Sequence, residues 1–410
     1  MLAHSDCRLV LVSPEWEARV RALLQGIGRA IAVRVVVADA VTGPEALGVD
    51  APSQPPASDA PALLMYTSGT TGRPKGVLLS QRNLVANALS VSHEHALGPA
   101  DRVLAVLPLY HINAFVVTLL APLAHGGCLV MPARFSSKQF WSQAAQHRCT
   151  WLNLVPTMIS YLLEATAPQA AQTRGIRFCR SASAALPVAH LRAFEARFGI
   201  GIVETMGLTE TAAPSFSNPL EAAQRKAGSV GRASGGEARI VDASLAPLPD
   251  DQTGEITIRG PHVMRGYYKD DAATQVAFTP DGWLRSGDLG YRDSDGFFFV
   301  TGRIKELIIK GGENIAPREI DEALLRHPAV LEAAAVGIPD PHYGQDIVAC
   351  VVLRPGHSLM EADLRDFCLS QLGRYKTPRV FRFVDHLPRG PSGKVQRLKL
   401  LDGFAPASVS

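Results

Sequence analysis

The chain has 410 residues, of which 47% are hydrophobic and 19% are charged. It is therefore globular rather than disordered, and long enough for two or three domains. The 41 Lys and Arg residues against 38 Asp and Glu residues give a net charge of +3. This excludes a large electrostatic surface for nucleic acid, so any phosphate chemistry must come from locally placed groups.

Cysteine spacing and the N-terminal residues point to a cytoplasmic soluble protein. None of the six cysteines forms a C-x-x-C pair, so neither a zinc ribbon nor a redox motif is predicted. The first residues carry an acid and no apolar segment, which is unlike a signal peptide. The best apolar run, residues 114–124, is too short for a membrane span and contains Pro122.

The first half of the chain alternates predicted strands and helices. Apolar runs at 8–12 and 33–38 predict buried parallel strands, with a helix at 15–26 between them. The proline-rich stretch 50–62 is typical of a surface linker. The alternation continues to about residue 201, which predicts an α/β core; its further strands are expected at 63–66, 103–107 and 128–131, and its helices at 140–148 and 156–165.

The pattern changes after residue 228. Short alternating strands at 237–241, 254–259 and 297–301 predict a β-rich subdomain over about 228–302. A second unit with helices and strands follows, its first helix opening at Pro317. The predicted fold is a large α/β domain at 1–302 that includes the β-rich subdomain, followed by a smaller, mobile α+β domain at 303–410.

A loop rich in glycine and hydroxyl groups follows the strand at 63–66. Glycines let backbone N–H groups approach an anion, hydroxyls donate to phosphate oxygens, and Lys75 adds positive charge. It is not a Walker A loop, because Pro74 and Gly76 stand where that motif needs glycine and Ser or Thr. It still predicts a phosphate site, with candidate ligands Thr67, Ser68, Gly69, Thr70, Thr71, Gly72 and Lys75.

This loop resembles the signature loop of the adenylate-forming superfamily, which includes acyl-CoA synthetases, peptide-synthetase adenylation domains and luciferases. Five further segments resemble motifs of that family, in its order and across essentially the whole chain: 108–111, 205–210, 283–288, 302–314 and 388–394. The resemblance implies an AMP-forming acid–thiol ligase. ATP and Mg²⁺ would activate a carboxylic acid as an acyl adenylate, which CoA would then attack to release AMP.

The resemblance also assigns catalytic residues. Two anions meet during adenylation, so positive charge must lie between them, and Lys394 takes this role, although it also fits a solvated lysine of a basic tail. Thr209 would bind the α-phosphate, and Glu210 would be the magnesium ligand rather than a helix-cap acid. Asp288 would accept hydrogen bonds from the ribose unless it is a turn aspartate, and Arg303 would add a second contact.

Two segments are expected around adenine. Residues 181–187 resemble the wall of small residues beside the base, although a plain loop explains them nearly as well. Met206 stands where the family usually has an aromatic ring, and its thioether can still cover the base. The nucleotide-binding residues predicted from these segments are Ser183, Ala184, Glu204, Thr205, Met206 and Gly207.

The remaining residues concern the acid, the hinge and CoA. By resemblance, His111 gates the acyl pocket and assists adenylation, where a core histidine is the alternative. Asn113 points into that pocket, and a buried amide favours a small or polar acid unless it serves only a neighbouring hydrogen bond. Lys305 would be the hinge, or a surface lysine, while Gly311 and Gly312 would line the CoA tunnel within a hairpin turn.

Two alternatives remain open at this point. One is an enzyme that delivers its acyl group to a carrier protein instead of CoA. The other is a nucleotide-binding remnant without turnover, because family members carry a further N-terminal stretch and this chain is expected to lack it. The expected partners are a small carboxylic acid, ATP and CoA, without nucleic acid or a transmembrane segment, and a homodimer is left open.

Overall fold

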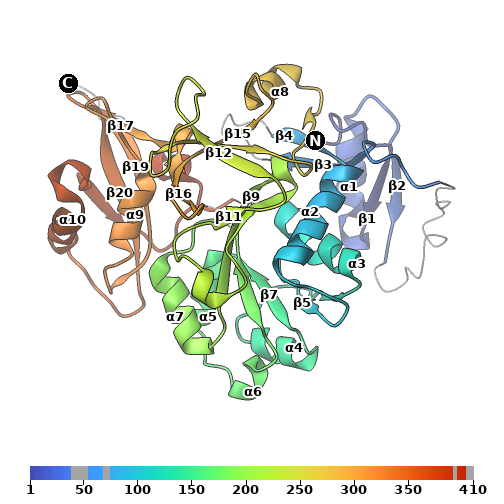
Figure 1. The fold of residues 1–410 in the computed structure, drawn as a ribbon, viewed down its shortest axis with the longest axis horizontal. Helices are drawn as coiled ribbons and strands as arrows, with labels where there is room; N and C mark the ends of the chain where they lie inside the picture. The colour runs from blue at the N-terminus through green and yellow to red at the C-terminus, as the bar shows by residue number, and fades with distance from the viewer. Residues whose placement is uncertain (38–53, 68–73, 391–394, 403–410) are drawn as a thin grey trace.

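The computed structural model describes residues 1–37, 54–67, 74–390 and 395–402 (Figure 1). Its largest sheet has seven strands in the order β11-β10-β9-β8-β7-β5-β6. β9, β8, β7, β5 and β6 run parallel, while β10 and β11 join antiparallel. The strands are β5 (Arg102–Leu104), β6 (Cys128–Val130), β7 (Trp151–Leu154), β8 (Phe178–Ser181), β9 (Ile202–Leu208), β10 (Ala213–Ser217) and β11 (Arg232–Ala233).

Helices cover both faces of this sheet, as the predicted α/β alternation requires. On one face they pack over Trp151, Phe178 and Val203, and on the other over Leu152, Cys179 and Ile202. The first face is covered by α2 (Gln81–Glu94), the π-helix η4 (Asn113–Leu120) and α3 (Ala121–His125). The second is covered by α4 (Phe140–Gln146), α5 (Pro156–Glu164) and α7 (Val188–Phe198), with the short α6 (Ala170–Thr173) beside α4. The α/β prediction is confirmed.

The run at 114–124 forms most of η4 and α3, and it packs against α2. Among the described residues, no helix combines the length and the apolar character that a membrane span needs. α2 begins at Ser80, whose hydroxyl accepts the Asn83 N–H while the Asn83 side chain accepts the Ser80 N–H. This reciprocal capping fixes the start of the helix directly after a strand.

A three-stranded sheet carries the ends of the predicted phosphate loop. β3 (Pro61–Thr67) and β4 (Lys75–Ser80) form an antiparallel hairpin in which Thr67 lies opposite Lys75. β14 (Gly266–Tyr267) pairs with β4 on its other side. The predicted ligands Ser68, Gly69, Thr70, Thr71 and Gly72 lie outside the described residues, as does Lys394.

The predicted β-rich region forms a four-stranded antiparallel sheet in the order β12-β13-β15-β16. Its core contains Phe216, Ile240, Ile256 and Phe298. The elements are β12 (Glu237–Val241), β13 (Gly254–Arg259), β15 (Leu284–Arg292) and β16 (Phe298–Arg303), with α8 (Asp271–Ala277) before β15 and the short η6 (Ala222–Gln224) before β12. β16, which the sequence predicts at 297–301, starts one residue later and ends two residues later than predicted.

The C-terminal part has a sheet and a core of its own, and it lies beside the large part, in orange and red in Figure 1. It follows the short helix η7 (Ile304–Glu306), which supports the domain boundary that we propose near residue 302. Its elements are β17 (Ile308–Lys310), β18 (Glu313–Ile315), α9 (Pro317–Leu324), β19 (Val330–Asp340), β20 (Gly344–Leu353), α10 (Glu361–Lys376), β21 (Val380–Phe383) and η8 (Arg397–Leu401).

One expectation about the first strands is wrong. β1 (Leu9–Val12) and β2 (Ala32–Val35) pair in parallel around η1 (Pro14–Trp16) and α1 (Glu17–Gln25), as predicted, but of their residues only Val12 is buried. The side chains of Leu9 and Leu11 are 41% and 51% exposed. The reason is that these two strands pair only with each other within the described residues, so no larger sheet and second helical layer enclose them.

Candidate active site

Ser183 follows β8, and Thr209 and Glu210 follow β9, at the carboxyl ends of two neighbouring parallel strands. Ligands of parallel α/β sheets bind at this edge. β8 ends at Ser181, just before the predicted adenine wall, and β9 continues into the short helix η5 (Thr209–Thr211), which carries Thr209 and Glu210. The N-terminus of η4 brings Asn113 to the loop after β8, where its side-chain amide donates to the Ser183 hydroxyl at 3.2 Å.

Lys75 and Glu210 meet at a tyrosine that the sequence did not single out. The Lys75 Nζ lies 4.8 Å from the centre of the Tyr267 ring, a cation–π distance. The Tyr267 hydroxyl donates to Glu210 Oε1 at 2.9 Å. Burial, together with the neighbouring Glu210 carboxylate, raises the pKa of Tyr267, so its hydroxyl stays a hydrogen-bond donor. No local signal marks Tyr267, which lies 57 residues from Glu210 and reaches it through the pairing of β14 with β4.

The surroundings of Glu210 fit a magnesium ion held mainly by phosphate oxygens and water. Its backbone is fixed by the Met264 N–H, which donates to the Glu210 carbonyl at 2.7 Å. Tyr267 occupies one carboxylate oxygen and leaves the other for a cation. In the described ranges no group of three His, Cys, Asp or Glu side chains forms a metal cluster. One carboxylate, together with phosphate oxygens and water, is a donor set that Mg²⁺ accepts.

The predicted ribose residues face each other across two strands. Asp288 on β15 lies opposite Arg303 on β16, and the Arg303 Nε donates to Asp288 Oδ1 at 2.8 Å. Asp288 is only 3% exposed. The Asp288 carboxylate raises the pKa of the Arg303 guanidinium, so this guanidinium stays charged. This pair holds the carboxylate in one orientation, and its contact with ribose stays a prediction.

The segments predicted around adenine are packed tightly. The Thr205 hydroxyl donates to the Ser181 carbonyl at 3.3 Å, which joins β9 to β8. A Cβ on Gly207 would lie 1.9 Å from the Ala213 carbonyl oxygen, so only glycine fits where β9 meets β10. Ser183 has a φ of 74°, a strained conformation that often marks a functional loop.

Two of these side chains have partners within the protein. Met206 packs against the core of the four-stranded sheet and stays partly exposed. Glu204 is buried, and its Oε2 accepts the Gly228 N–H at 3.0 Å. The Glu204 carboxylate therefore orders the loop at Gly228, and a direct contact of either residue with the nucleotide stays a prediction. Ala184 is exposed beside Ser183.

The buried Glu204 makes stability depend on pH. Burial raises the pKa of its carboxyl group from the ordinary 4.5 to about 7. The folded protein binds this proton more tightly than the unfolded chain, so stability falls as the pH rises from about 4.5 to about 7. Glu204→Gln, which keeps an acceptor for Gly228, is expected to be more stable than the parent by about 2 kcal/mol at pH 8 and to gain much less at pH 5. Urea unfolding of both proteins at the two pH values measures this, and an equal difference at both would contradict it.

One predicted acyl-pocket residue, Asn113, contacts a buried arginine. Asn113 Oδ1 accepts from Arg180 Nη1 at 2.7 Å and from Asn153 Nδ2 at 3.4 Å. His111 lies two residues before Asn113, and its backbone carbonyl accepts the Phe115 N–H at 2.9 Å. Sequence reasoning missed Arg180. The available signal was a charged residue inside a strand that is buried on both faces.

The hinge and tunnel residues lie next to each other in the C-terminal part. Lys305 is exposed in η7, directly after Arg303 and Ile304. Gly311 and Gly312 form the turn between β17 and β18, with φ angles of 55° and 86° that favour glycine. The turn prediction is confirmed, while the hinge and the CoA tunnel stay predictions.

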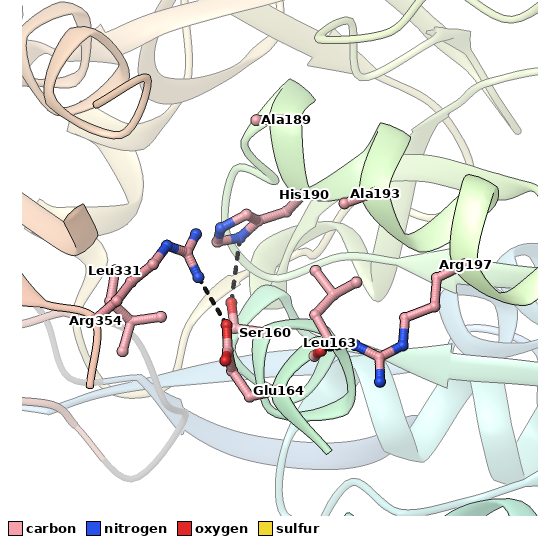
Figure 2. Close-up of a pocket in the computed structure, with 9 residues that line it drawn as sticks. All are labelled: Ser160, Leu163, Glu164, Ala189, His190, Ala193, Arg197, Leu331 and Arg354. Atoms are coloured by element: carbon pink, nitrogen blue, oxygen red, sulfur yellow. Dashed lines mark hydrogen bonds and ion pairs between the residues drawn. The ribbon is translucent and has the colours of Figure 1, made fainter. Parts of the chain in front are cut away.

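A separate pocket of about 400 Å³ lies between the large part and the C-terminal part (Figure 2). Arg354 reaches across it, and its Nη1 lies 2.7 Å from Glu164 Oε1 on α5. Beside this pair, the Ser160 hydroxyl and His190 Nδ1 are 3.2 Å apart. None of the predicted site residues that the structure describes lines this pocket. An exposed ion pair such as Arg354–Glu164 contributes at most about 1 kcal/mol to holding the two parts together.

The comparison with protein families decides the identity. Residues 1–268 match the AMP-binding enzyme family, and residues 319–394 match the AMP-binding enzyme C-terminal domain. The chain belongs to the AMP-binding enzyme family. Its relatives include a sulfoacetate–CoA ligase of Cupriavidus necator, 64% identical over 98% of this chain and 79% of that protein. An oxalate–CoA ligase of Arabidopsis thaliana is 37% identical over 97% of this chain and 79% of that protein.

Solved structures agree with this AMP-binding enzyme in fold. ATP-bound MatB from Rhodopseudomonas palustris has a TM-score of 0.91 and 31% identity, covering 98% of this chain and 80% of that one. The o-succinylbenzoate CoA synthetase MenE from Bacillus subtilis, in complex with ATP and a magnesium ion, has a TM-score of 0.83 and 32% identity over 97% and 80%. The chain thus spans about four fifths of the length of these proteins.

Proposed function

We propose that this AMP-binding enzyme is an acid–thiol ligase that uses ATP and Mg²⁺ to adenylate a carboxylic acid and then forms its CoA thioester. The observation that carries this is the 64% identity, over 98% of the chain, to a sulfoacetate–CoA ligase. The structure also holds the groups that ATP chemistry needs near phosphates, namely cations and a candidate metal ligand. These are Lys75, Glu210 and the Asp288–Arg303 pair.

One group of residues would bind the phosphates of ATP, and another would bind its ribose. Lys75 and the loop that it closes would bind the phosphates, and Glu210 would hold Mg²⁺, which supplies charge neutralisation at the phosphate oxygens. Asp288, oriented by Arg303, would bind the ribose. Lys394 would place positive charge between the carboxylate and the α-phosphate, with Thr209 donating to the latter. CoA would then approach past Gly311 and Gly312 after the small domain rotates at Lys305.

The proposed substrate is a small or polar acid. Asn113 is buried and already hydrogen-bonded to Arg180 and Ser183, so this wall of the pocket is polar. The two curated relatives described above are named for sulfoacetate and oxalate, both short acids. A long alkyl chain offers neither a hydrogen bond nor a charge to such polar groups, so it gains little at this wall.

The decisive experiment is a panel of acids in an assay of AMP release that depends on ATP and CoA. Acetate, oxalate, malonate, sulfoacetate, octanoate and benzoate would be compared at equal concentration. We expect AMP release with at least one of the four short acids and little with octanoate or benzoate. AMP release that favours octanoate or benzoate would contradict the small polar substrate.

The same assay separates the alternatives. If a phosphopantetheinylated carrier protein stimulates turnover and free CoA does not, the enzyme is an acyl donor to a carrier. If no acid causes pyrophosphate release, the chain is a nucleotide-binding remnant. The homodimer and the cytoplasmic location expected from the sequence stay predictions.

A further inference from the structure

Arg180 is a buried cation without an acidic partner among the described residues. Two lysine or arginine residues are buried in the described ranges, Lys310 and Arg180. Lys310 follows the usual rule, because its Nζ lies 2.6 Å from Asp346 Oδ1. Arg180 is 1% exposed, and its Nη1 donates only to amide oxygens, those of Asn113 at 2.7 Å and Asn153 at 2.9 Å.

The guanidinium also keeps an unused donor. Its Nε is buried and has no hydrogen-bond partner among the described residues. Burial lowers the pKa of Arg180 to about 9, and no carboxylate counteracts this shift. Neutral amides replace only part of the water that a cation loses, so this arrangement is costly for the protein alone. A protein keeps such a costly buried charge at a place where a bound anion pairs with it and offsets the cost.

The position of Arg180 indicates which anion this is. Arg180 is the second-to-last residue of β8, so it lies at the edge of the sheet where the candidate site lies. Its partner Asn113 is the predicted acyl-pocket residue and also donates to Ser183 on the loop after β8. Asn113 therefore links Arg180 to Ser183, which places Arg180 next to the residue that is predicted to line the acyl pocket.

We propose that Arg180 determines specificity in the acyl pocket by pairing with a second anionic group of the substrate, a sulfonate or a second carboxylate. This inference rests on the proposed acid–thiol ligase function and narrows its substrate to short acids with two negative charges. One carboxylate is adenylated, and the distal anion receives the unused donor of the guanidinium while Asn113 fixes the orientation of Arg180.

The test compares each dianionic acid with an uncharged-tail analogue of similar shape. Sulfoacetate is matched with 3,3-dimethylbutanoate, and malonate with 3-methylbutanoate. The ratio of kcat/KM within each pair is measured from AMP release for the parent, Arg180→Gln and Arg180→Lys. In the parent we expect the dianion to be preferred. We expect Arg180→Gln to lower this ratio about 50-fold, mainly through KM for the acid, and Arg180→Lys to restore part of it.

A matched control and a folding check keep the result interpretable. Arg177→Gln makes the same change three residues away, at a side chain that is 41% exposed and ion-paired with Asp101, and it should keep the parental ratio. KM for ATP and the melting temperature report on a general structural effect. If Arg180→Gln lowers kcat/KM equally for both members of a pair, Arg180 only supports the fold and the proposal is wrong.

Measurements on the parent protein test the proposed role of Arg180 even if the variants do not fold. A parent that turns over the uncharged-tail analogue as well as the dianion would overturn the role of Arg180 while leaving the ligase function intact. A parent that releases no AMP with any acid would instead overturn the ligase function itself. The two failures are therefore distinguishable.

Discussion

Glu210→Gln is expected to lower the rate of pyrophosphate release about 1000-fold at a fixed Mg²⁺ concentration. Glutamine keeps an oxygen that can accept from Tyr267, which lies 2.9 Å from the Glu210 carboxylate, so local packing is preserved and mainly the charge is lost. Without that charge, Mg²⁺ is bound less tightly and neutralises the phosphates less well. Titration of activity with MgCl₂ should show that the variant needs a higher concentration of the metal.

Tyr267→Phe is the matched control for this change. It removes the hydroxyl that orients Glu210 but keeps the carboxylate and the ring over which Lys75 lies. We expect a loss of about 10-fold, because orientation and not charge is affected. If Glu210→Gln required the same Mg²⁺ concentration as the parent, Glu210 would not be the metal ligand, whatever its effect on the rate.

Asp288→Asn is expected to raise KM for ATP about 100-fold. The carboxylate is buried and held by Arg303 Nε at 2.8 Å, so it presents a charged acceptor in a fixed orientation. Hydrogen bonds to a charged group contribute about 1.5–3 kcal/mol each, and an amide in the same place accepts more weakly. The variant should bind the carboxylic acid normally once ATP is saturating, so the loss should appear in KM for ATP more than in kcat.

Asp281→Asn provides the comparison for this variant. Asp281 also pairs with an arginine, Arg239 at 2.8 Å, but on the surface, where its side chain is 56% exposed. It should leave KM for ATP at the parental value, since exposed pairs contribute little. If the two substitutions raised KM for ATP equally, Asp288 would not belong to the nucleotide site. A melting curve of Asp288→Asn separates lost affinity from lost folding.

Much of the fold follows from local patterns in the sequence. The strands at 237–241 and 254–259 appear with the predicted bounds because alternating side chains and flanking turns define antiparallel strands locally. Burial of β1 and β2 could not be predicted this way. A continuous apolar run is the same whether a strand lies inside a large sheet or pairs with one neighbour, and only the tertiary structure decides between them.

In the candidate site, too, local sequence predicts some residues and misses others. Glu210 and Asp288 could be proposed from the sequence because each lies in a short segment that resembles a family motif. Tyr267 lies in no such motif, and the one local signal of Arg180 is its charge within a buried strand; their partners Glu210 and Asn113 lie 57 and 67 residues away in the chain. Their roles arise from strand pairing and from the absence of an acid near a buried charge, which are properties of the folded chain.

The Asp288–Arg303 pair has a mechanical consequence. Arg303 is the last residue of β16, and the predicted pivot at Lys305 follows only two residues later. An ion pair thus fixes the backbone at the proposed ribose site, while the domain that we propose beyond this point has about a hundred residues and a radius of gyration of about 13 Å. A small backbone rotation beside the ribose site would therefore sweep the far side of that domain through several times the displacement at the pivot. A ligand bound at Asp288 would make the backbone beside the predicted hinge more rigid, while the C-terminal domain could still rotate.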